Sequence, residues 1–386
     1  MAQTSVSTAM EGPKKAYKGK KLRVAIIGCG GIAQAHLAAY KSIPEVEIVA
    51  GVDIDIERLK VMRDKWGVPE DCLFGADFKT GKTTSQTAWK DMLKKMGDKI
   101  DAFDVCTPNG WHCQPVVDGC NAGKHAITEK PMAMNPAECE KMIAAAEKNN
   151  VKLSVGFQHR YRPGMKALME ARDNGAFGDI MFVKVQAIRR RGIPNWGVFG
   201  QKEKQGGGPM IDIGVHMIEA AYEFMGCPKP IAASANCWTY MGNKEEATKV
   251  RCPWPGWDWK TYTVEDLAIG QIRFDNGAIM QIEASFAAHI KEEKHCFTAI
   301  GTKAGCEWPS PTMIYTDQNN TMVDIAPHFL GDDGWEAMFI NKLQNWVNGC
   351  LKGTELDASG YDGLAVQKIL DGVYRSAAAG KEVAIK

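Results

Sequence analysis

Between residues 22 and 157, short and fully apolar runs alternate with stretches that carry apolar positions at helical spacing. The first run, Leu22 to Ile27, is β-branched and aliphatic throughout, which is typical of a strand buried on both faces of a sheet. Its repetition predicts strand–helix–strand units and hence an α/β domain with one doubly wound parallel sheet of Rossmann type. The expected strands are 22–27, 46–52, 102–106, 126–128 and 152–157, and the expected helices are 30–41, 55–66, 89–96, 113–122 and 136–149.

Beyond about Arg160 the runs become longer and alternate every second residue, which predicts strands with one buried face in an antiparallel sheet. Asn276-Gly277 separates two of these runs and is the preferred pair for a type I′ hairpin, because both central residues of that turn need a positive φ. The expected strands are 180–188, 231–241, 264–274, 278–286 and 294–300, and the expected helices are 163–174, 212–225, 335–351 and 361–379. We therefore expect an α+β C-terminal domain whose helices cover one face of a large, mostly antiparallel open sheet.

The composition is that of a globular protein that recognises its partners locally. Of 386 residues, 45% are apolar, and 47 Lys and Arg balance 46 Asp and Glu, so the net charge of +1 creates no field that would gather nucleic acid or an anionic membrane. We expect neither partner. Residues 1–21 are rich in lysine and lack an apolar run, which predicts a flexible leader. Twelve cysteines without a C-x-x-C pair favour a reduced, cytoplasmic setting.

A glycine-rich turn between the first expected strand and helix carries the clearest chemical signal. Gly28 to Ala33 matches the G-x-G-x-x-G/A fingerprint of dinucleotide-binding folds, at the required place in a strand–turn–helix unit. Gly28 permits the tight turn, Gly30 lets the backbone approach a pyrophosphate, and Ala33 lets the helix pack closely on the strand. The cofactor-binding candidates in this turn are Gly28, Gly30, Gly31, Ile32 and Ala33.

Asp53 ends the second expected strand, 20 residues after Ala33, where a carboxylate can accept hydrogen bonds from an adenosine ribose. The alternative is a helix N-cap, for which Asp55 is the better candidate. No Lys or Arg follows before Arg58, so a 2′-phosphate would meet negative charge, and NAD is favoured over NADP. Asp53 and Arg58 join the cofactor-binding candidates.

Three further motifs, together with Gly28 to Ala33, carry a resemblance to a known family. They are Thr107-Pro108-Asn109 with His112, Glu129-Lys130-Pro131, and the glycine-rich segment from Gly206 to His216. From Leu22 to the C-terminus the chain resembles the Gfo/Idh/MocA oxidoreductases. The resemblance implies a cofactor-binding domain over residues 22–158 and a substrate-binding and oligomerisation domain over residues 159–386. Further cofactor contacts that it implies are Thr107, Pro108, Asn109, His112, Glu129 and Lys130.

The last two motifs also hold the acid–base candidates. Asp212 and His216 are four residues apart, so on a helix they present a carboxylate and an imidazole on one face. Histidine suits removal of a hydroxyl proton near neutral pH, and we assign His216 as the base. The resemblance implies that Lys130 hydrogen-bonds the reacting hydroxyl and takes part in proton relay, while Asp212 holds a neighbouring hydroxyl or orients the site.

Structural alternatives exist for each of these residues. Lys130 could be an exposed loop cation, Asp212 a cap at a helix start, and His216 a satisfied core histidine. A metal shared by Asp212 and His216 is a further alternative, but we expect none, because no other ligand motif accompanies them.

Substrate contacts are expected at two further places. The segment 157–161 lies at the domain junction, where the family has residues that contact cofactor or substrate, and Arg160 and Tyr161 are the candidates there. Trp254 and Trp257 belong to a loop with three indoles, whose faces suit the C–H faces of a sugar. Packing of that loop on a neighbouring subunit is the alternative. The run 189–191 of three arginines could meet an anionic group, with a solvated strand end as the favoured alternative.

We therefore predict a cytoplasmic, NAD-dependent dehydrogenase that oxidises a secondary hydroxyl of a sugar, glycoside or cyclic polyol to a ketone, with C3 of a glucosyl unit as one candidate position. Redox-neutral use of tightly bound NAD, as in glycosidic cleavage through a transient ketone or in sugar-to-sugar transfer, is one alternative. A non-catalytic NAD-sensing protein on the same fold is another. The edges and apolar face of an open sheet also predict a homo-oligomer, either a dimer or a tetramer.

Overall fold

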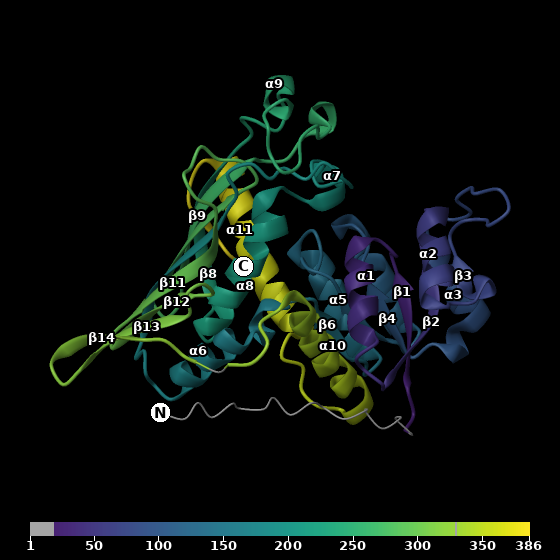
Figure 1. The fold of residues 1–386 in the computed structure, drawn as a ribbon, viewed down its shortest axis with the longest axis horizontal. Helices are drawn as coiled ribbons and strands as arrows, with labels where there is room; N and C mark the ends of the chain where they lie inside the picture. Colours follow the sequence, from purple (N-terminus) through teal and green to yellow (C-terminus); the bar gives the residue numbers. More distant parts are fainter. Residues whose placement is uncertain (1–18, 329) are drawn as a thin grey trace, which may run out of the picture.

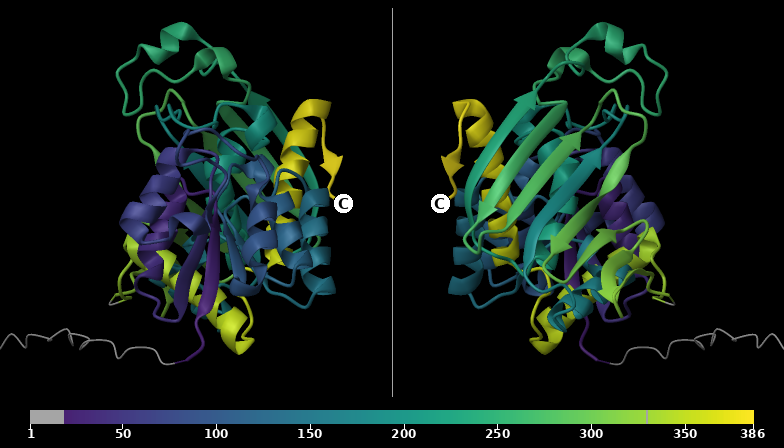
Figure 2. Two further views of the ribbon diagram at one scale, coloured as in Figure 1. Left: turned by 90° about the vertical axis from the view of Figure 1, so that its right-hand side faces the viewer. Right: turned by 90° about the vertical axis from the view of Figure 1, so that its left-hand side faces the viewer.

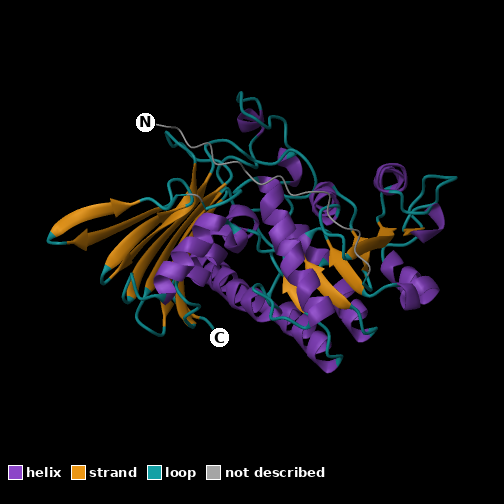
Figure 3. Ribbon diagram, turned by 60° about the horizontal axis from the view of Figure 1, so that its bottom comes forward, coloured by secondary structure: helices purple, strands orange, loops and turns teal. Residues whose placement is uncertain are grey.

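The computed structural model describes residues 19–328 and 330–386. Figure 1 shows two sheets, with the strands of the N-terminal part on one side and the long strands of the C-terminal part on the other. Helices fill the space between the two sheets, as Figure 3 shows by secondary structure. Most of the expected leader lies outside the described residues.

The first sheet has six parallel strands in the order β3-β2-β1-β4-β5-β6, which confirms the Rossmann prediction. The sheet order changes direction between β1 and β4, where the carboxyl ends of strands leave a crevice for a ligand. The strands are β1 (Leu22–Ile27), β2 (Val46–Val52), β3 (Leu73–Phe74), β4 (Ala102–Val105), β5 (His125–Thr128) and β6 (Leu153–Val155), and the helices are α1 (Gly31–Tyr40), α2 (Ile56–Trp66), α3 (Ala88–Met96), α4 (Cys113–Asn121) and α5 (Pro136–Lys148).

Successive residues of β1 enter two different hydrophobic clusters, because neighbouring side chains of a strand point to opposite faces. Val24 and Ile26 pack into the cluster that holds α1 and α2, whereas Ala25 and Ile27 pack into the cluster that holds α3, α4 and α5. Both faces of this strand are therefore covered, as its unbroken apolar run predicted.

The second sheet has nine strands in the order β14-β13-β12-β11-β7-β10-β9-β8-β15. All neighbouring pairs are antiparallel except β7 with β10. One face carries α8 and α11, while the other is uncovered in the right-hand view of Figure 2. The strands are β7 (Ile180–Ile188), β8 (Pro230–Trp238), β9 (Leu267–Phe274), β10 (Ile279–Ser285), β11 (Lys294–Gly301), β12 (Ala304–Trp308), β13 (Met313–Gln318), β14 (Thr321–Ile325) and β15 (Val383–Ala384), and the helices are α6 (Pro163–Asp173), α7 (Lys202–Gln205), α8 (Val215–Phe224), α9 (Glu245–Thr248), α10 (Trp335–Lys352) and α11 (Gly360–Ala379).

The hairpin between β9 and β10 is present, but its turn differs from the predicted type I′. Gly277 has a φ of 87°, whereas Asn276 is not among the residues with positive φ. The amide of Gly277 donates to the carbonyl of Phe274, and the amide of Phe274 donates to the carbonyl of Ala278. This pattern is that of a type I turn followed by one left-handed glycine, which forms a bulge and needs no strained asparagine.

Helix α10 crosses back to the first sheet, although its residues follow the whole second sheet in sequence. Phe339, Leu343, Trp346 and Val347 are buried in the same cluster as residues of β1 and α1. The C-terminal part of the chain therefore completes the core of the N-terminal part, and a sequence boundary at residue 158 does not separate two independent cores.

Two local details complete the fold. The predicted helix 212–225 begins instead as a π-helical turn, Met210–Gly214, that continues into α8. Such turns are uncommon and are frequent at functional sites. No helix among the described residues has both the length and the apolarity needed to cross a bilayer.

Candidate active site

Gly28 joins the end of β1 to the loop after β4, and only glycine fits there. Its φ is +86°, and a Cβ at this position would lie 2.8 Å from the backbone nitrogen of Thr107. Its own amide donates to the carbonyl of Val52 over 2.8 Å. The turn is thus held against both neighbouring strands, as the fingerprint requires.

The first turn of α1 has the features of a pyrophosphate cradle. Gly30 occupies the N-cap and offers no side-chain hydrogen bond to the helix, so the first amides are left for a ligand. A Cβ added at Gly31 would meet nothing within 4 Å, so the space in front of the helix is open. Ala33 is fully buried. The residues present therefore fit the phosphates of a dinucleotide.

Asp53 is buried at the end of β2, and both of its oxygens accept backbone hydrogen bonds. Oδ2 accepts from Cys29 over 2.8 Å, and Oδ1 accepts from Asp55 over 2.9 Å. Asp55, and not Asp53, caps α2 through the amide of Glu57, so the N-cap alternative for Asp53 is excluded. Asp53 stands beside the nucleotide turn and is oriented before any ligand binds.

Arg58 lies closer to this carboxylate than the sequence argument assumed. Its guanidinium is 4.0 Å from Asp53 and occupies the position that a Cβ of Gly30 would take. A cation therefore stands at the adenosine end of the expected nucleotide site, and the premise that a 2′-phosphate would meet only negative charge is wrong. The position of Arg58 is consistent with a cofactor contact.

The motif after β4 has a connecting role in the structure. The ring nitrogens of His112 lie 2.8 Å from the carbonyl oxygens of Pro131 and Thr107, so this buried ring ties the loop after β4 to the loop after β5. Asn109 donates through its side chain to the carbonyl of Gln205 over 2.9 Å, which links the first domain to the glycine-rich segment of the second. Thr107, whose carbonyl His112 contacts, and Pro108 directly precede Asn109.

Lys130 and Asp212 meet across the two domains. The Lys130 ammonium donates to the backbone carbonyl of Asp212 over 2.8 Å and lies 3.2 Å from its Oδ1. Both side chains keep some exposure, 15% for Lys130 and 16% for Asp212, which is what a group that must meet a ligand needs. These two residues are 82 positions apart in the sequence, and the structure brings them into direct contact.

The glycine-rich segment before Asp212 is held by one buried carboxylate. Glu265 accepts hydrogen bonds from the amides of Gly208 and Met210 over 2.9 and 3.2 Å, and from the hydroxyl of Tyr374. A Cβ at Gly208 would lie 2.4 Å from the carbonyl oxygen of Glu265, so close backbone packing explains that glycine. These contacts fix the π-helical turn that carries Asp212.

His216 follows in the first turn of α8 and forms no hydrogen bond with the described residues. Its Nδ1 is buried without a partner. Burial, reinforced by the nearby Lys130 cation, lowers the pKa of His216 well below the usual histidine value. The imidazole is therefore neutral near pH 7, and its Nδ1 without a partner argues against a satisfied core histidine.

Two further histidines, His159 and His295, lie beside His216, and neither was among the predicted site residues. The ring centroid of His159 is 5.1 Å from that of His216, and the ring of His295 on β11 is 5.6 Å from that of His159. His159 is buried, its Nδ1 has no partner, and burial lowers its pKa well below the usual value. The only sequence signal was the position of His159 at the domain junction.

Lys130, Asp212, His216 and His159 at the domain junction are referred to below as the cleft. Arg160 is buried in an ionic cluster and is not available to a substrate there, so its assignment as a substrate contact is wrong. It is 3% exposed and forms ion pairs with Glu219, Glu223 and Asp362, the nearest at 2.5 Å. Burial of a guanidinium requires such compensation, and the carboxylates raise the pKa of Arg160. Tyr161 is equally buried and donates to Asn345, so it has a structural role beside α10.

The two tryptophans of the indole-rich loop differ. Trp257 is buried and donates through Nε1 to the carbonyl of Gly242 over 2.8 Å, so it anchors the loop and does not offer a face to a substrate. Trp254 is half-buried between Trp196, which meets it edge-on, and the Arg189 guanidinium, 5.0 Å from its ring centre. Trp254 remains available at the surface.

Glu129 belongs to a buried ionic cluster beneath the cleft. Its Oε1 lies 2.8 Å from the Lys342 ammonium and 3.1 Å from Nε2 of His36. Nδ1 of His36 lies 2.7 Å from Asp104, which also accepts from Tyr40. Burial opposes ionisation of Glu129, but Lys342 and His36 outweigh it and keep the pKa of this carboxyl low. Glu129 therefore supports the Lys130 loop from below.

Metal ligands do not converge on Asp212 and His216. Among the described residues, the sets of three potential ligand atoms that lie within 4.8 Å of one another are His36 with Asp104 and Cys106, and Glu223 with Cys227 and Asp362. Neither set includes a residue of the cleft.

Comparison with known proteins gives consistent results over nearly the whole chain. Residues 22–157 match the family description "Oxidoreductase family, NAD-binding Rossmann fold", and residues 165–307 match the GFO/IDH/MocA C-terminal domain. The chain is 32% identical to D-glucoside 3-dehydrogenase of Escherichia coli K12 over 373 residues, 96% of this chain and 99% of that protein. It is 21% identical to inositol 2-dehydrogenase of Rhizobium meliloti over 375 residues, 94% of this chain and 99% of that protein.

Solved structures share the fold. Levoglucosan dehydrogenase in complex with NADH superposes with a TM-score of 0.79 at 22% identity, covering 95% of this chain and all of that chain. Aldose-aldose oxidoreductase from Caulobacter crescentus superposes with a TM-score of 0.75 at 23% identity and the same coverage. At this level of identity the likeness extends to the arrangement of both sheets.

Proposed function

The chain belongs to the Gfo/Idh/MocA oxidoreductases, and from this premise we propose that it uses NAD to oxidise a secondary hydroxyl of a sugar or glycoside to a ketone. The observation that carries the proposal is the meeting of Lys130, Asp212 and His216 at the junction of the two domains. A cation paired with a carboxylate stands beside a neutral imidazole, and this trio can position an alcohol and remove its proton.

In the proposed reaction His216 is the proton acceptor. Its lowered pKa keeps the ring unprotonated, and its lack of partners leaves a nitrogen for the hydroxyl. Lys130 donates to the same oxygen and stabilises the negative charge that develops there, while Asp212 orients the ammonium and accepts from a neighbouring hydroxyl. A bound nicotinamide supplies the hydride acceptor.

C3 of a glucoside is the position that we propose for the oxidation. Support comes from the relative of 32% identity, which is named for that activity and matches over 96% of this chain and 99% of its own. Trp254, half-buried on the indole-rich loop, provides an aromatic surface for the aglycone or the sugar face.

NAD is the cofactor that we propose, with support from Asp53. Its carboxylate is held by two amides beside the nucleotide turn and suits a ribose diol better than a phosphate. Arg58 makes the choice testable, because a guanidinium at this place could also meet a 2′-phosphate. Replacing Asp53 with Ser should raise the relative affinity for NADP if Asp53 selects NAD, and equal affinities in the native protein would contradict the proposal.

The decisive experiment supplies NAD and a panel of glucosides, free sugars and inositols, and follows NADH together with the identity of the product. We expect NADH and a 3-keto glucoside in equal amounts. Ketone or cleavage products without free NADH would instead support redox-neutral use of bound cofactor, and NAD binding without turnover on any compound would support a sensing role. Lys130→Met with His216→Asn in one chain should abolish turnover and retain NAD binding.

We also propose that the uncovered face of the second sheet pairs with a second copy of the chain. Met181, Ile269 and Ile300 are exposed on strands of this sheet, and exposed apolar side chains on an uncovered sheet face favour association. The cytoplasm remains the proposed location, supported by twelve cysteines that are all unpaired thiols. Light scattering of the purified protein tests the oligomer, and a monomer would contradict it.

A further inference from the structure

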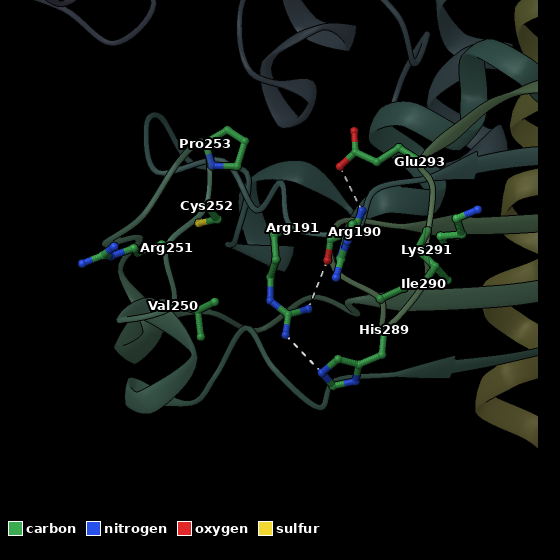
Figure 4. Close-up of a pocket in the computed structure, with 11 residues that line it drawn as sticks. Arg190, Arg191, Val250, Arg251, Cys252, Pro253, His289, Ile290, Lys291 and Glu293 are labelled. Atoms are coloured by element: carbon green, nitrogen blue, oxygen red, sulfur yellow. Dashed lines mark hydrogen bonds between the residues drawn. The ribbon is translucent and has the colours of Figure 1, made fainter.

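A cavity of about 830 Å³ lies at the end of β7, and none of the three residues of the proposed reaction lines it. Figure 4 shows that one wall consists of Arg190 and Arg191 with the segment 288–293, and the other of the segment 250–253. The volume is that of a site for a small organic molecule.

The backbone fixes this cavity in place. The amide of Ala288 donates to the carbonyl of Arg190, and the amide of Gly192 donates to that of Phe286, so the arginine segment is tied to the neighbouring chain on both sides of Arg191. On the opposite wall, Asn195 holds the carbonyl of Pro255 over 2.9 Å. A site that exists before its ligand arrives loses less entropy on binding.

Three arginines of the cavity have no carboxylate partner among the described residues. Within residues 19–328 and 330–386, the guanidinium groups of Arg190, Arg191 and Arg251 form no ion pair with a carboxylate. Lys291 also lines the cavity, but its ammonium lies 3.3 Å from the carboxylate of Glu292 and is paired with it. The single acidic residue of the lining, Glu293, accepts from the backbone amide of Arg190 over 3.0 Å.

Arg191 is the residue best placed to bind an anion. Its Nη1 donates to the carbonyl of Arg190, and its Nη2 lies 3.1 Å from Nε2 of His289, an arrangement visible in Figure 4. Its Nε is buried and has no partner. A buried guanidinium donor without an acceptor is unfavourable, and a phosphate or carboxylate would supply oxygens in the geometry that guanidinium groups bind best.

The remaining lining is apolar. Val250, Pro253 and Ile290 face the same space, so a ligand with carbon atoms next to its anionic group would bury them there. We propose that this cavity binds an organic anion, with its phosphate or carboxylate at Arg191 and its apolar part against Val250, Pro253 and Ile290.

The anion has two possible sources, because the cavity adjoins the cleft of the proposed reaction. Arg189 directly precedes Arg190 of the cavity wall. Burial lowers the pKa of Arg189, and the carboxylates of Asp212, in the cleft, and Glu293, in the cavity, partly oppose this effect, so Arg189 lies between the two sites. The anionic group can therefore belong to the distal end of a substrate or to a separate molecule. The experiment distinguishes the two sources.

Binding is measured first, by titration calorimetry with phenyl phosphate and with inorganic phosphate. Saturating NAD is present, so that phosphate at α1 does not contribute. We expect phenyl phosphate to bind more tightly than inorganic phosphate, Arg191→Gln to weaken it about 10- to 100-fold, and Ile290→Ser to weaken phenyl phosphate alone. Arg273→Gln, at an exposed arginine of β9 that pairs with Glu382, is the matched control and should change nothing. Equal affinities for native protein and Arg191→Gln would overturn the proposal.

Turnover then identifies the source. Phenyl glucoside is compared with its 4-carboxyphenyl counterpart in native protein, Arg191→Gln and Arg273→Gln. A preference of tenfold or more for the carboxylate in kcat/KM, lost only in Arg191→Gln, assigns the anion to the substrate. Equal rates, with binding of phenyl phosphate still dependent on Arg191, assign it to a separate molecule. The binding experiment needs no turnover, so failure of the proposed reaction would leave this result standing.

Discussion

Histidines are buried in two regions of this molecule, and their surroundings have opposite effects. His36 lies on α1 and packs against Phe339 of α10, with its ring nitrogens within hydrogen-bond distance of Asp104 and Glu129. His216 lies at the cleft, where its buried Nδ1 has no partner. Burial favours the neutral ring in both places. At His36 the carboxylates of Asp104 and Glu129 together outweigh burial and the Lys342 cation and raise the pKa, whereas at His216 no carboxylate opposes burial and the Lys130 cation, and the pKa is lowered.

The difference separates a structural group from a reactive one. Every charge around His36 is compensated within the protein, so that cluster is complete without a ligand. His159 and His216 each have a buried Nδ1 without a hydrogen-bond partner. Such unpaired groups cost stability, and proteins keep them mainly where a ligand completes the hydrogen bonds. The same residue type thus supports the scaffold in one region and proton transfer in the other.

The largest expected effect follows from removing the base. His216→Asn should lower kcat by about a hundred- to ten-thousandfold, the usual contribution of a general base, while NAD binding is retained. Steady-state kinetics and NAD titration measure both quantities. His328→Asn, at an exposed histidine, is the control. A variant with near-native kcat would remove His216 from the proposed mechanism.

Breaking the compensated cluster should affect stability. Lys342→Met leaves the Glu129 carboxylate buried without its ammonium partner, and loss of one member of a buried pair costs about 3–5 kcal/mol. Urea unfolding measures this cost. Lys352→Met, at the exposed end of the same helix, should stay within about 0.5 kcal/mol of the native protein. A similarly small change in Lys342→Met would mean that the cluster does not stabilise the fold.

Removing the Lys130 cation should bring the pKa of His216 closer to that of an ordinary histidine. In Lys130→Met, the pKa of His216 should rise toward the usual histidine value, because one cause of its depression is gone while burial remains. NMR titration of the imidazole resonances reports this shift, with Lys148→Met, at an exposed lysine of α5, as the control. An unchanged pKa would mean that burial alone sets it.

The smallest effect is also the most direct test of the contrast between the two regions. A histidine whose pKa is raised on folding stabilises the fold below about pH 6.5, and this contribution is lost as the pH rises through the folded pKa. A histidine whose pKa is lowered does the reverse and costs stability as the pH falls below about 6.5. The free energy of unfolding of His36→Asn should therefore be lower than that of the native protein at acid pH, and this difference should shrink as the pH becomes alkaline. For His216→Asn, the free energy of unfolding should increase relative to that of the native protein as the pH becomes acid. Urea unfolding across the pH range measures both differences. If the two differences changed in the same direction with pH, the opposite pKa shifts of His36 and His216 would be contradicted.

Features that depend on neighbours in sequence were predictable. Gly28 and Ala33 act within one turn, and their roles follow from spacing between a strand and a helix. Lys130, Asp212 and His216 were identified through motifs, and the structure brings them to one cleft. The turn at Asn276 was the exception, because one extra residue in the loop changed its type.

Features that depend on distant segments were not predictable. Lys342 is 306 residues from His36, and no local pattern signals that contact. Arg160 and His159 are neighbours in one short turn, yet His159 reaches the cleft and Arg160 a buried set of carboxylates. Sequence position placed both at the junction, and only the packing of α8 and α11 decides which side chain points where.

The return of α10 to the first sheet has a consequence for how the protein is made. On the ribosome, residues 22–157 emerge long before Phe339, Lys342 and Trp346, which cover that sheet and neutralise Glu129. Until then the N-terminal segment exposes an apolar surface and its Glu129 lacks the ammonium partner, and such a partly folded state is prone to aggregation. Synthesis must run almost to the end of the chain before either half can finish folding.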